Sequence, residues 1–175
     1  MRLPNLDRDQ YTKTLKSKGY KYLNSGAFGS VYSKGKGSKH VIKVCGDEDN
    51  YIEYLKHRIP GNPFFPKIHS IKKFYDKEEC ENWFAVKMER LIPYSKVPRK
   101  VRSKIEEKHG LRHGIEDLCD NIDLLMWGAR NKQYKNFLKV LNKMFDRYRD
   151  DMHDGNVMFR KRGRGYQLVV TDPIV

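Results

Sequence analysis

The chain has 175 residues, of which 38% are hydrophobic and 33% are charged, and its formal net charge is +14. Its 11 tyrosines and 8 phenylalanines can build an apolar core, which excludes a disordered chain. The sequence has no apolar run of the roughly eighteen residues that a membrane span needs, and none of signal-peptide length near its start. We therefore expect neither a membrane protein nor a secreted one.

The positive charge raises the question of partners. A surface of this kind attracts nucleic acid, acidic proteins or nucleotide phosphates, and a surface that is simply basic is the alternative. The three cysteines, Cys45, Cys80 and Cys119, are scattered and form no Cys-x-x-Cys pair. We therefore expect a reducing cytoplasm and no zinc site.

The first part of the chain predicts a short helix followed by strands. Residues 1–19 are polar and mixed, which allows a lead-in helix. Residues 20–23 and 30–33 then flank a small-residue turn, Asn-Ser-Gly-Ala-Phe-Gly at 24–29, and predict a hairpin. A third strand, rich in β-branched residues, is expected at 40–44.

A second short helix is expected at 49–57, because a Pro-Gly-Asn-Pro run at 60–63 would stop it. Two further strands are predicted at 68–71 and 83–88. The first half of the chain therefore has the character of a sheet with few helices.

After Leu91 the pattern becomes helical, over residues 98–148. The clearest helix is expected at 131–148, where apolar residues recur every three or four positions. The last elements are a tight polar loop at 150–156, a strand at 157–159, a basic turn at 160–165 and a strand at 167–170. This order predicts an α+β protein with a boundary near 91–95.

Two features of the first half could bind phosphate groups. Gly26 and Gly29 let the backbone approach a ligand closely, so that N–H groups can cradle phosphate oxygens; a plain hairpin turn is the alternative. Lys43 shares a strand face with Val41, where an ammonium group needs an anionic partner unless its stem reaches out to solvent. Its position fourteen residues after Gly29 favours phosphate binding.

Two features of the second half could carry acid–base and metal chemistry. Asp151 can orient an attacking hydroxyl group or accept its proton, and the amide oxygen of Asn156 is a hard ligand suited to Mg²⁺. Asp172 follows an apolar run at 168–170 and suits a second metal ligand. Taken alone, each has an ordinary alternative, a polar turn for the first pair and a strand-end cap for Asp172.

The four features occur in one order, and together they resemble the protein-kinase signature of Gly-rich loop, strand lysine, catalytic loop and metal-binding Asp. More closely, residues 20–175 resemble the early protein kinases of T7-type bacteriophages. The motifs that carry this resemblance are Leu23–Phe28, Val41–Val44, Asp151–Phe159 and Thr171–Ile174. The resemblance implies a bilobal protein kinase-like fold of the α+β class.

In that fold, residues 1–91 would form an antiparallel-sheet lobe that binds the nucleotide, and residues 92–175 a truncated, mainly helical lobe. The resemblance places Asn24, Gly26 and Gly29 at the three glycine positions of the loop. Phe28 would lie at the loop tip over the phosphates of ATP, and Val31 would cover its adenine.

The resemblance also assigns the rest of the nucleotide site. Lys43 ends the run Val41-Ile42-Lys43 and would contact the α- and β-phosphates. Glu53, with Glu48 as the alternative, would pair with this lysine. The run Met88-Glu89-Arg90-Leu91 resembles a gatekeeper residue followed by the hinge that binds adenine.

The catalytic loop would be Asp151-Met152-His153-Asp154-Gly155-Asn156, with Asp151 as the base or hydroxyl-orienting residue. Asn156 and Asp172 would hold Mg²⁺. His153 stands where protein kinases usually have a phosphate-contacting lysine, and a histidine there also resembles the small-molecule kinases of the same fold.

Three departures from the kinase pattern carry expectations of their own. Arg149-Asp150 replaces the usual His-Arg pair, so we do not expect control by a phosphorylated activation loop. The first loop glycine is absent, so we expect looser nucleotide binding. The sequence ends three residues after Asp172, so we expect peptide recognition elsewhere, at residues 93–130 or on the second subunit of a homodimer.

The resemblance implies a serine/threonine protein kinase in the host bacterial cytoplasm, acting on host proteins such as transcription or translation machinery to take over the host. Two alternatives stay open: a small-molecule kinase, and a catalytically weak kinase-fold protein that inhibits a host complex by binding it. Nucleic-acid binding through the basic stretches 96–108 and 160–164 is disfavoured, because aromatic residues are not interleaved there.

Overall fold

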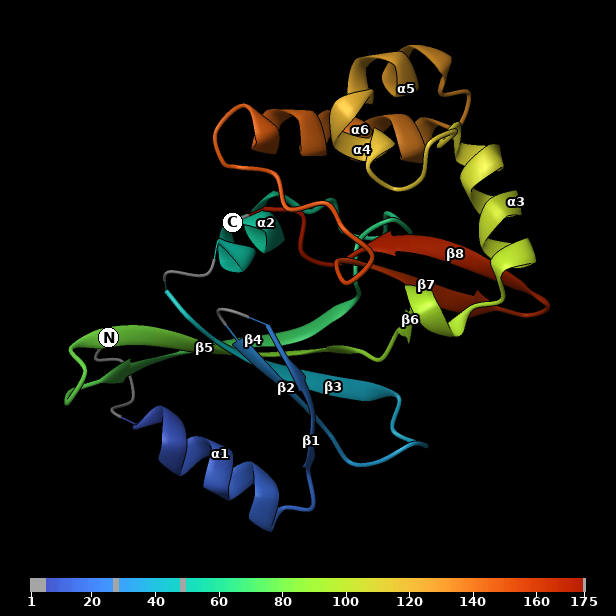
Figure 1. Ribbon diagram of the computed structural model, residues 1–175. Coiled ribbons are helices and arrows are strands. Elements are labelled where there is room, and N and C mark those ends of the chain that lie inside the picture. The colour runs from blue at the N-terminus through green and yellow to red at the C-terminus, as the bar shows by residue number, and fades with distance from the viewer. Residues whose placement is uncertain (1–5, 27–28, 48–49, 175) are drawn as a thin grey trace. The chain divides into compact units, whose positions relative to one another are not determined.

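The structure is a computed structural model, and it describes residues 6–26, 29–47 and 50–174. The chain forms two compact units. The first comprises Met1–Asp49 and Lys67–Arg90, and the second comprises Asn50–Pro66 and Leu91–Val175. Both contain helices and antiparallel sheet, which confirms the α+β class (Figure 1).

The first unit is a five-stranded antiparallel sheet with one helix along a face of it (Figure 1). The strand order is β1-β2-β3-β5-β4. The elements are α1 (Arg8–Ser17), β1 (Lys21–Ser25), β2 (Gly29–Ser33), β3 (His40–Gly46), β4 (Ile68–Asp76) and β5 (Glu81–Glu89). All five predicted strands of this half are therefore confirmed, although β4 continues five residues beyond the predicted end at Ile71.

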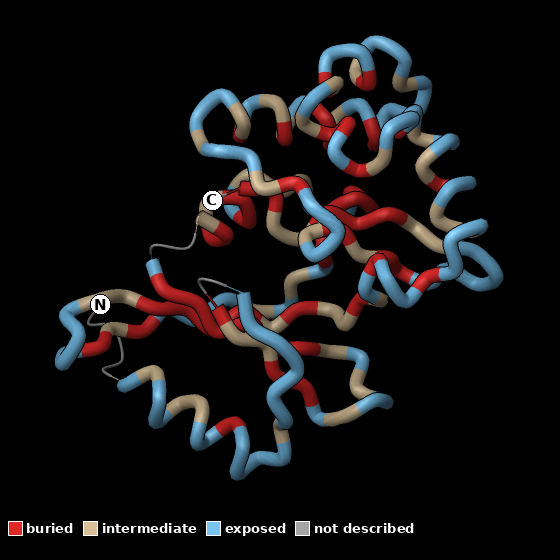
Figure 2. The backbone as a smooth tube through the Cα atoms, in the orientation of Figure 1, coloured by how far each residue is buried: buried red, intermediate tan, exposed pale blue. Residues whose placement is uncertain are grey.

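The sheet is buried at its centre and exposed at its edges. The central strand β3 consists of buried residues from Val41 to Gly46, whereas β1 is exposed along its whole length (Figure 2). The other edge strand, β4, carries the exposed lysines Lys72 and Lys73. Lysine side chains on an exposed edge strand discourage pairing with other chains, so the β4 edge is protected from aggregation.

The second unit combines a three-stranded antiparallel sheet, in the order β6-β7-β8, with most of the helices. Its strands are β6 (Ile92–Pro93), β7 (Val157–Arg162) and β8 (Gly165–Val170). Its helices are α2 (Tyr51–His57), η1 (Tyr94–Lys96), α3 (Arg99–His109), α4 (Asp117–Asp120), α5 (Ile122–Gly128) and α6 (Lys132–Phe145).

The helix α6 confirms the clearest helical prediction, although it ends at Phe145 rather than at residue 148. The side-chain oxygen of Asn131 caps it by accepting the N–H of Tyr134 at 3.0 Å. Its buried side chains recur with helical spacing, as an amphipathic helix requires. They are Tyr134, Phe137, Leu138, Leu141 and Met144.

The hairpin of β7 and β8 differs from the prediction at its turn. Arg160 was expected in an exposed basic turn, but it lies within β7 with only 8% of its surface exposed. Its guanidinium group donates to the carbonyl oxygens of Pro63 at 2.7 Å and Phe65 at 2.9 Å. The turn itself consists of Gly163 and Arg164, so the basic surface here is smaller than the sequence indicated.

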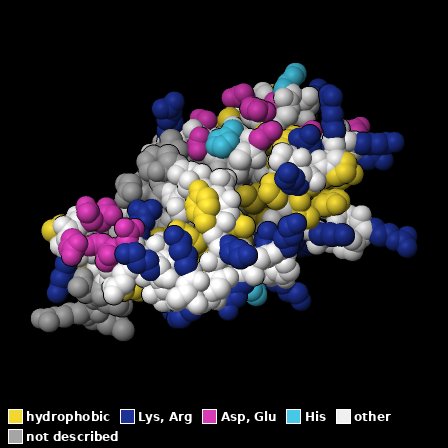
Figure 3. Space-filling model, turned by 60° about the horizontal axis from the view of Figure 1, so that its bottom comes forward, with side chains coloured by type: hydrophobic (Ala, Val, Ile, Leu, Met, Phe, Trp, Pro, Cys, Tyr) yellow, Lys and Arg dark blue, Asp and Glu magenta, His cyan; other side chains and the backbone are white. Residues whose placement is uncertain are grey.

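No helix in the described part of the chain is long and apolar enough to cross a membrane. On the face drawn in Figure 3, lysine and arginine side chains are spread widely, whereas acidic side chains gather in a few places. This distribution agrees with the formal net charge of +14.

Candidate active site

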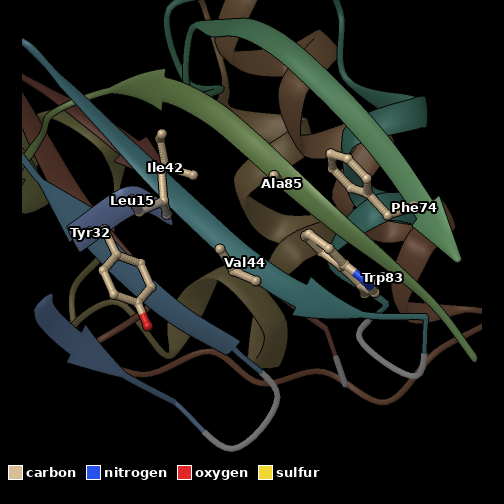
Figure 4. Packing of buried hydrophobic residues seen from close by; sticks show 7 residues of the cluster. All are labelled: Leu15, Tyr32, Ile42, Val44, Phe74, Trp83 and Ala85. Carbon is tan, nitrogen blue, oxygen red and sulfur yellow. The ribbon is translucent and has the colours of Figure 1, made fainter. Parts of the chain in front are cut away.

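The first sheet keeps its apolar core on one face. The buried cluster on that face is formed by Leu15 of α1 and strand residues (Figure 4), and the sequence alternation of β3 supplies Ile42 and Val44 to it. Successive side chains of a strand point to opposite faces. Val41 and Lys43 therefore lie on the other face, away from α1.

Four of the predicted nucleotide-binding residues share this second face. In the antiparallel register Lys43 lies opposite Val31 of β2, and Val41 lies opposite Met88 of β5. Opposed residues in antiparallel strands point to the same face. Val31, Val41, Lys43 and Met88 thus form one group, which we call the sheet group. Val86, opposite Lys43 on β5, completes it and was not predicted.

Gly29 is fitted closely against Lys43. A Cβ atom at residue 29 would lie 2.9 Å from the carbonyl oxygen of Val44 and 3.1 Å from Cε of Lys43. The first distance is too short for any side chain, because the neighbour is backbone, whereas the lysine stem could move by a few tenths of an ångström. Glycine is therefore required here for packing against the lysine stem, not only for turn flexibility.

The turn before Gly29 is closed by its own backbone. The N–H of Gly26 donates to the carbonyl oxygen of Gly29 at 2.9 Å, and Asn24 lies opposite Val31 after an irregularity in β1. Asn24 therefore stands beside Val31 of the sheet group. Phe28 and Glu48 lie outside the described residues.

The predicted hinge begins at the end of β5. The N–H of Glu89 donates to the carbonyl oxygen of Lys67 at 2.9 Å, and the N–H of Arg90 donates to that of Lys39 at 2.9 Å. Leu91 comes next and is buried. It is the residue at which the chain enters the second unit again. An adenine contact through Glu89 would therefore need its carbonyl oxygen rather than its N–H.

The predicted catalytic loop in the second unit is internally hydrogen-bonded. The amide nitrogen of Asn156 donates to the carbonyl oxygen of Asp151 and to its Oδ2, both at 2.8 Å. The N–H of Gly155 donates to Nδ1 of His153 at 3.0 Å. Nε2 of the same ring lies 3.0 Å from the amide nitrogen of Asn156 and 3.6 Å from Oδ2 of Asp151, and which of these it bonds depends on the ring tautomer.

The loop is held against the segment that contains Asp172. The N–H of Asp151 donates to the carbonyl oxygen of Pro173 at 2.9 Å. At the other end of the loop, the carbonyl oxygen of Asn156 accepts bonds from the N–H of Thr171 at 2.8 Å and from its Oγ1 at 2.9 Å. Asp172 is thus bracketed by two residues that are bonded to the loop. We call Asp151, His153, Asn156 and Asp172 the loop group.

A buried tyrosine supports the same segment from α2. The Tyr54 hydroxyl donates to the carbonyl oxygen of Val170 at 2.8 Å. Burial and the nearby negative charge of Asp172 raise the pKa of Tyr54 well above its ordinary value, so the hydroxyl keeps its proton. Tyr54 therefore holds the end of β8 just before Asp172, a contribution that no sequence motif indicated.

The loop group fits a magnesium ion chemically. Because the nitrogen of the Asn156 amide is directed to Asp151, the amide oxygen is the end that can bind a cation. Asp172 supplies a carboxylate from the adjoining segment. In the described residues there is no group of three or more His, Cys, Asp or Glu side chains arranged to hold a metal, so an ion here would need ligands from a bound phosphate as well.

Glu53 lies in α2, within the second unit, and its carboxylate forms an ion pair with Lys56 of the same helix. Of the predicted site residues, the structure thus gathers Asn24, Gly26, Gly29 and the sheet group in the first unit. It gathers the loop group in the second. The alternation of β5 could have identified Val86, whereas Tyr54 depends on a contact across 116 positions of the chain.

The chain was compared with known proteins. A family model described as Bacteriophage T7 protein kinase 0.7 matches residues 6–175, nearly the whole chain. None of the curated proteins matches it. The matched range includes every residue of the sheet group and the loop group.

Proposed function

The chain belongs to the bacteriophage T7 protein kinase family, and we propose that it is a serine/threonine kinase that transfers the γ-phosphoryl group of ATP to host proteins. The observation that carries this proposal is the loop group. An Asp and an Asn five residues apart are joined by a side-chain hydrogen bond and anchored on both sides of a second Asp.

We infer a bilobal kinase fold in which the sheet group and the loop group bind the same nucleotide. The antiparallel register of the sheet group supports this, since it puts Lys43 beside the glycine turn and puts apolar Val31, Val41 and Met88 on the same face. An apolar surface suits the adenine ring, and an ammonium group next to backbone N–H groups suits phosphate oxygens.

In the proposed reaction the hydroxyl oxygen of the acceptor forms a bond to the γ-phosphorus, and the bond from that phosphorus to the bridging oxygen of ADP breaks. Oδ1 or Oδ2 of Asp151 orients the acceptor hydroxyl and receives its proton. Asn156 holds Asp151 in position through its amide nitrogen. The exposed ring of His153 would contact the phosphates, the role that lysine has in most protein kinases.

Asn156 and Asp172 would hold Mg²⁺, which neutralises charge on the transferred phosphoryl group when it is bound. Lys43 would hold the α- and β-phosphates, and Glu53 would have to leave Lys56 in order to pair with it. Correct placement and charge neutralisation, rather than covalent chemistry, would supply most of the rate enhancement.

The test is incubation of the purified chain with γ-labelled ATP and Mg²⁺, alone and with bacterial lysate, followed by mass spectrometry of the modified side chains. We expect label on serine and threonine hydroxyls of host proteins, and loss of all transfer when EDTA removes the metal. Label on small molecules alone would instead identify a small-molecule kinase, and no label at all would contradict phosphoryl transfer.

A further inference from the structure

A hollow of about 910 Å³ lies in the second unit, lined by residues other than the loop group. Its walls come from the end of α3, the connection from α3 to α4, helix α5, the start of α6 and the β7–β8 hairpin (Figure 1). A volume of this size accommodates a few side chains of a bound peptide. None of the four residues of the loop group lines it, so it is a separate feature of this unit.

The hollow has an aromatic floor and an exposed apolar rim. His109 packs between Phe64 and Tyr134, with ring centroids 5.2 Å and 4.6 Å away. On the rim, Leu124 is 69% exposed and Trp127 is 89% exposed. These two residues are three apart on α5 and therefore share one face of the helix. Large apolar side chains exposed next to each other mark an interaction surface, and tryptophan is enriched at the energetic centres of such surfaces.

Positive charge surrounds this rim. Cationic side chains from four separate segments line the hollow, namely Lys108, Arg112, Arg130 and Arg162. Two carboxylates also line it, but Asp117 is buried and accepts bonds from the N–H of His113 at 2.9 Å and the amide nitrogen of Asn121 at 2.6 Å. Glu107 is the exposed carboxylate of the lining, so the opening has a net positive field.

The positive field comes from the rim and not from the floor. Burial, with a smaller effect of Lys108, lowers the pKa of His109 to about 4. Its ring is therefore neutral at physiological pH, and the floor is an apolar surface. The hollow thus combines an uncharged aromatic base with guanidinium groups at its edge, which is the arrangement that an apolar side chain flanked by carboxylates would complement.

We propose that this hollow docks an acidic segment of a protein substrate, which inserts an aliphatic or aromatic side chain between its carboxylates. This inference rests on the proposed protein kinase function. The apolar side chain packs on Trp127 and Leu124, and the carboxylates pair with Arg112, Arg130 and Arg162. A nucleic acid fits less well, because the rim offers one exposed tryptophan beside aliphatic Leu124 and the carboxylate of Glu107, where a strand needs a series of stacking faces.

The test measures binding without ATP, so that it does not depend on catalysis. The probe is a fluorescein-labelled synthetic peptide with one leucine flanked by glutamates, and its anisotropy is followed as the full chain is added. We expect this peptide to bind about tenfold more tightly than the same peptide with glutamine for each glutamate. Equal binding of the two peptides, or no binding of the first, would overturn the proposal.

Two substitutions on the exposed rim locate the site. Trp127→Ala and Arg130→Glu should each weaken binding about tenfold, and neither side chain is buried, so folding is preserved. Lys72→Glu makes the same change of charge as Arg130→Glu on the exposed edge strand of the first unit and should bind like the wild type. Weakening by Lys72→Glu equal to that by Arg130→Glu would show a general charge effect and contradict a docking site.

The outcomes separate this proposal from the catalytic one. If the wild type transfers phosphate but neither rim substitution weakens binding, the docking site is wrong and the kinase function stands. If binding depends on Trp127 and Arg130 but no phosphate is transferred, the docking site stands and the kinase function is wrong. Tighter, Trp127-dependent binding of a labelled oligothymidylate would identify a nucleic-acid surface and overturn the proposal.

Discussion

At the scale of single residues, the candidate site depends on close packing as much as on charged groups. Gly29 has the backbone of Val44 and the stem of Lys43 within van der Waals reach of the position that a Cβ would occupy. The glycine therefore leaves room for the stem of Lys43 beside the backbone of Val44. The sequence motif indicated a flexible loop glycine, whereas the structure shows a packing constraint.

Gly29→Ala should therefore both destabilise the first unit and weaken nucleotide binding. We expect a loss of about 1–3 kcal/mol in the free energy of unfolding, because the added methyl group must displace backbone. Gly37→Ala is the matched control, since nothing lies within 4 Å of a Cβ at that exposed position. Chemical denaturation and nucleotide titration of both variants provide the measurement, and equal stabilities would contradict the packing argument.

His109 makes stability depend on pH in a defined direction. Its pKa falls to about 4 in the folded chain because of burial, below the ordinary histidine value of about 6.5 in the unfolded chain. The unfolded state therefore binds the extra proton first, and stability is lost as pH falls from about 6.5 to about 4. Allowing for partial exposure of the ring, the loss should be on the order of 2 kcal/mol.

His109→Gln should remove that part of the pH dependence, because glutamine does not titrate. The free energy of unfolding is measured between pH 4 and 7 for the wild type and for His109→Gln. An unchanged slope in His109→Gln would show that folding does not lower the pKa of this ring.

At the scale of elements, buried polar groups hold the residues that follow α2 in place within the second unit. Arg160 donates to the carbonyl oxygens of Pro63 and Phe65, and the Asn62 amide nitrogen donates to the carbonyl oxygen of Gln133 at 2.8 Å. The N–H of Val170 also donates to the carbonyl oxygen of Phe64 at 3.0 Å. The polar groups of residues 62–65 therefore have hydrogen-bond partners within the protein.

Arg160→Met should destabilise the protein by about 2–4 kcal/mol, because buried carbonyl groups lose charged donors. Arg164→Met, on the exposed turn of the same hairpin, should change stability by no more than about 0.5 kcal/mol. Thermal or urea unfolding distinguishes the two variants, and a similar effect of both would show that Arg160 contributes no more than a surface charge.

The strands and the α+β class followed from local patterns, because alternation on β3 and the apolar spacing on α6 are both consequences of a buried face. The ends of the helices and strands, and the interruptions between helices, could not be predicted from these local patterns. The helical periodicity of 98–148 is interrupted where Gly110 adopts a φ of 80° and ends α3, and β4 extends to Asp76 because Phe74 packs on Trp83. Such features depend on partners distant in sequence, as do Arg160 and Tyr54 in the candidate site.

At the scale of the whole molecule, two units carry complementary parts of one proposed chemistry. The sheet group offers an ammonium group and apolar side chains, and the loop group offers carboxylates, an amide and an imidazole. The match to the family model covers both groups, since it spans residues 6–175. The net charge of +14 would favour encounter with anionic nucleotides and acidic proteins at low ionic strength.

The most direct test of the central claim, that Asp151 and its neighbours carry out phosphoryl transfer, is transfer of labelled phosphate by Asp151→Ala beside its neighbour Asp150→Ala. We expect Asp151→Ala to lose about a thousandfold in transfer rate while its ATP affinity, measured by calorimetry, stays near that of the wild type. Asp150→Ala, whose exposed side chain lies outside the loop group, should stay active. Wild-type transfer by Asp151→Ala would contradict the account.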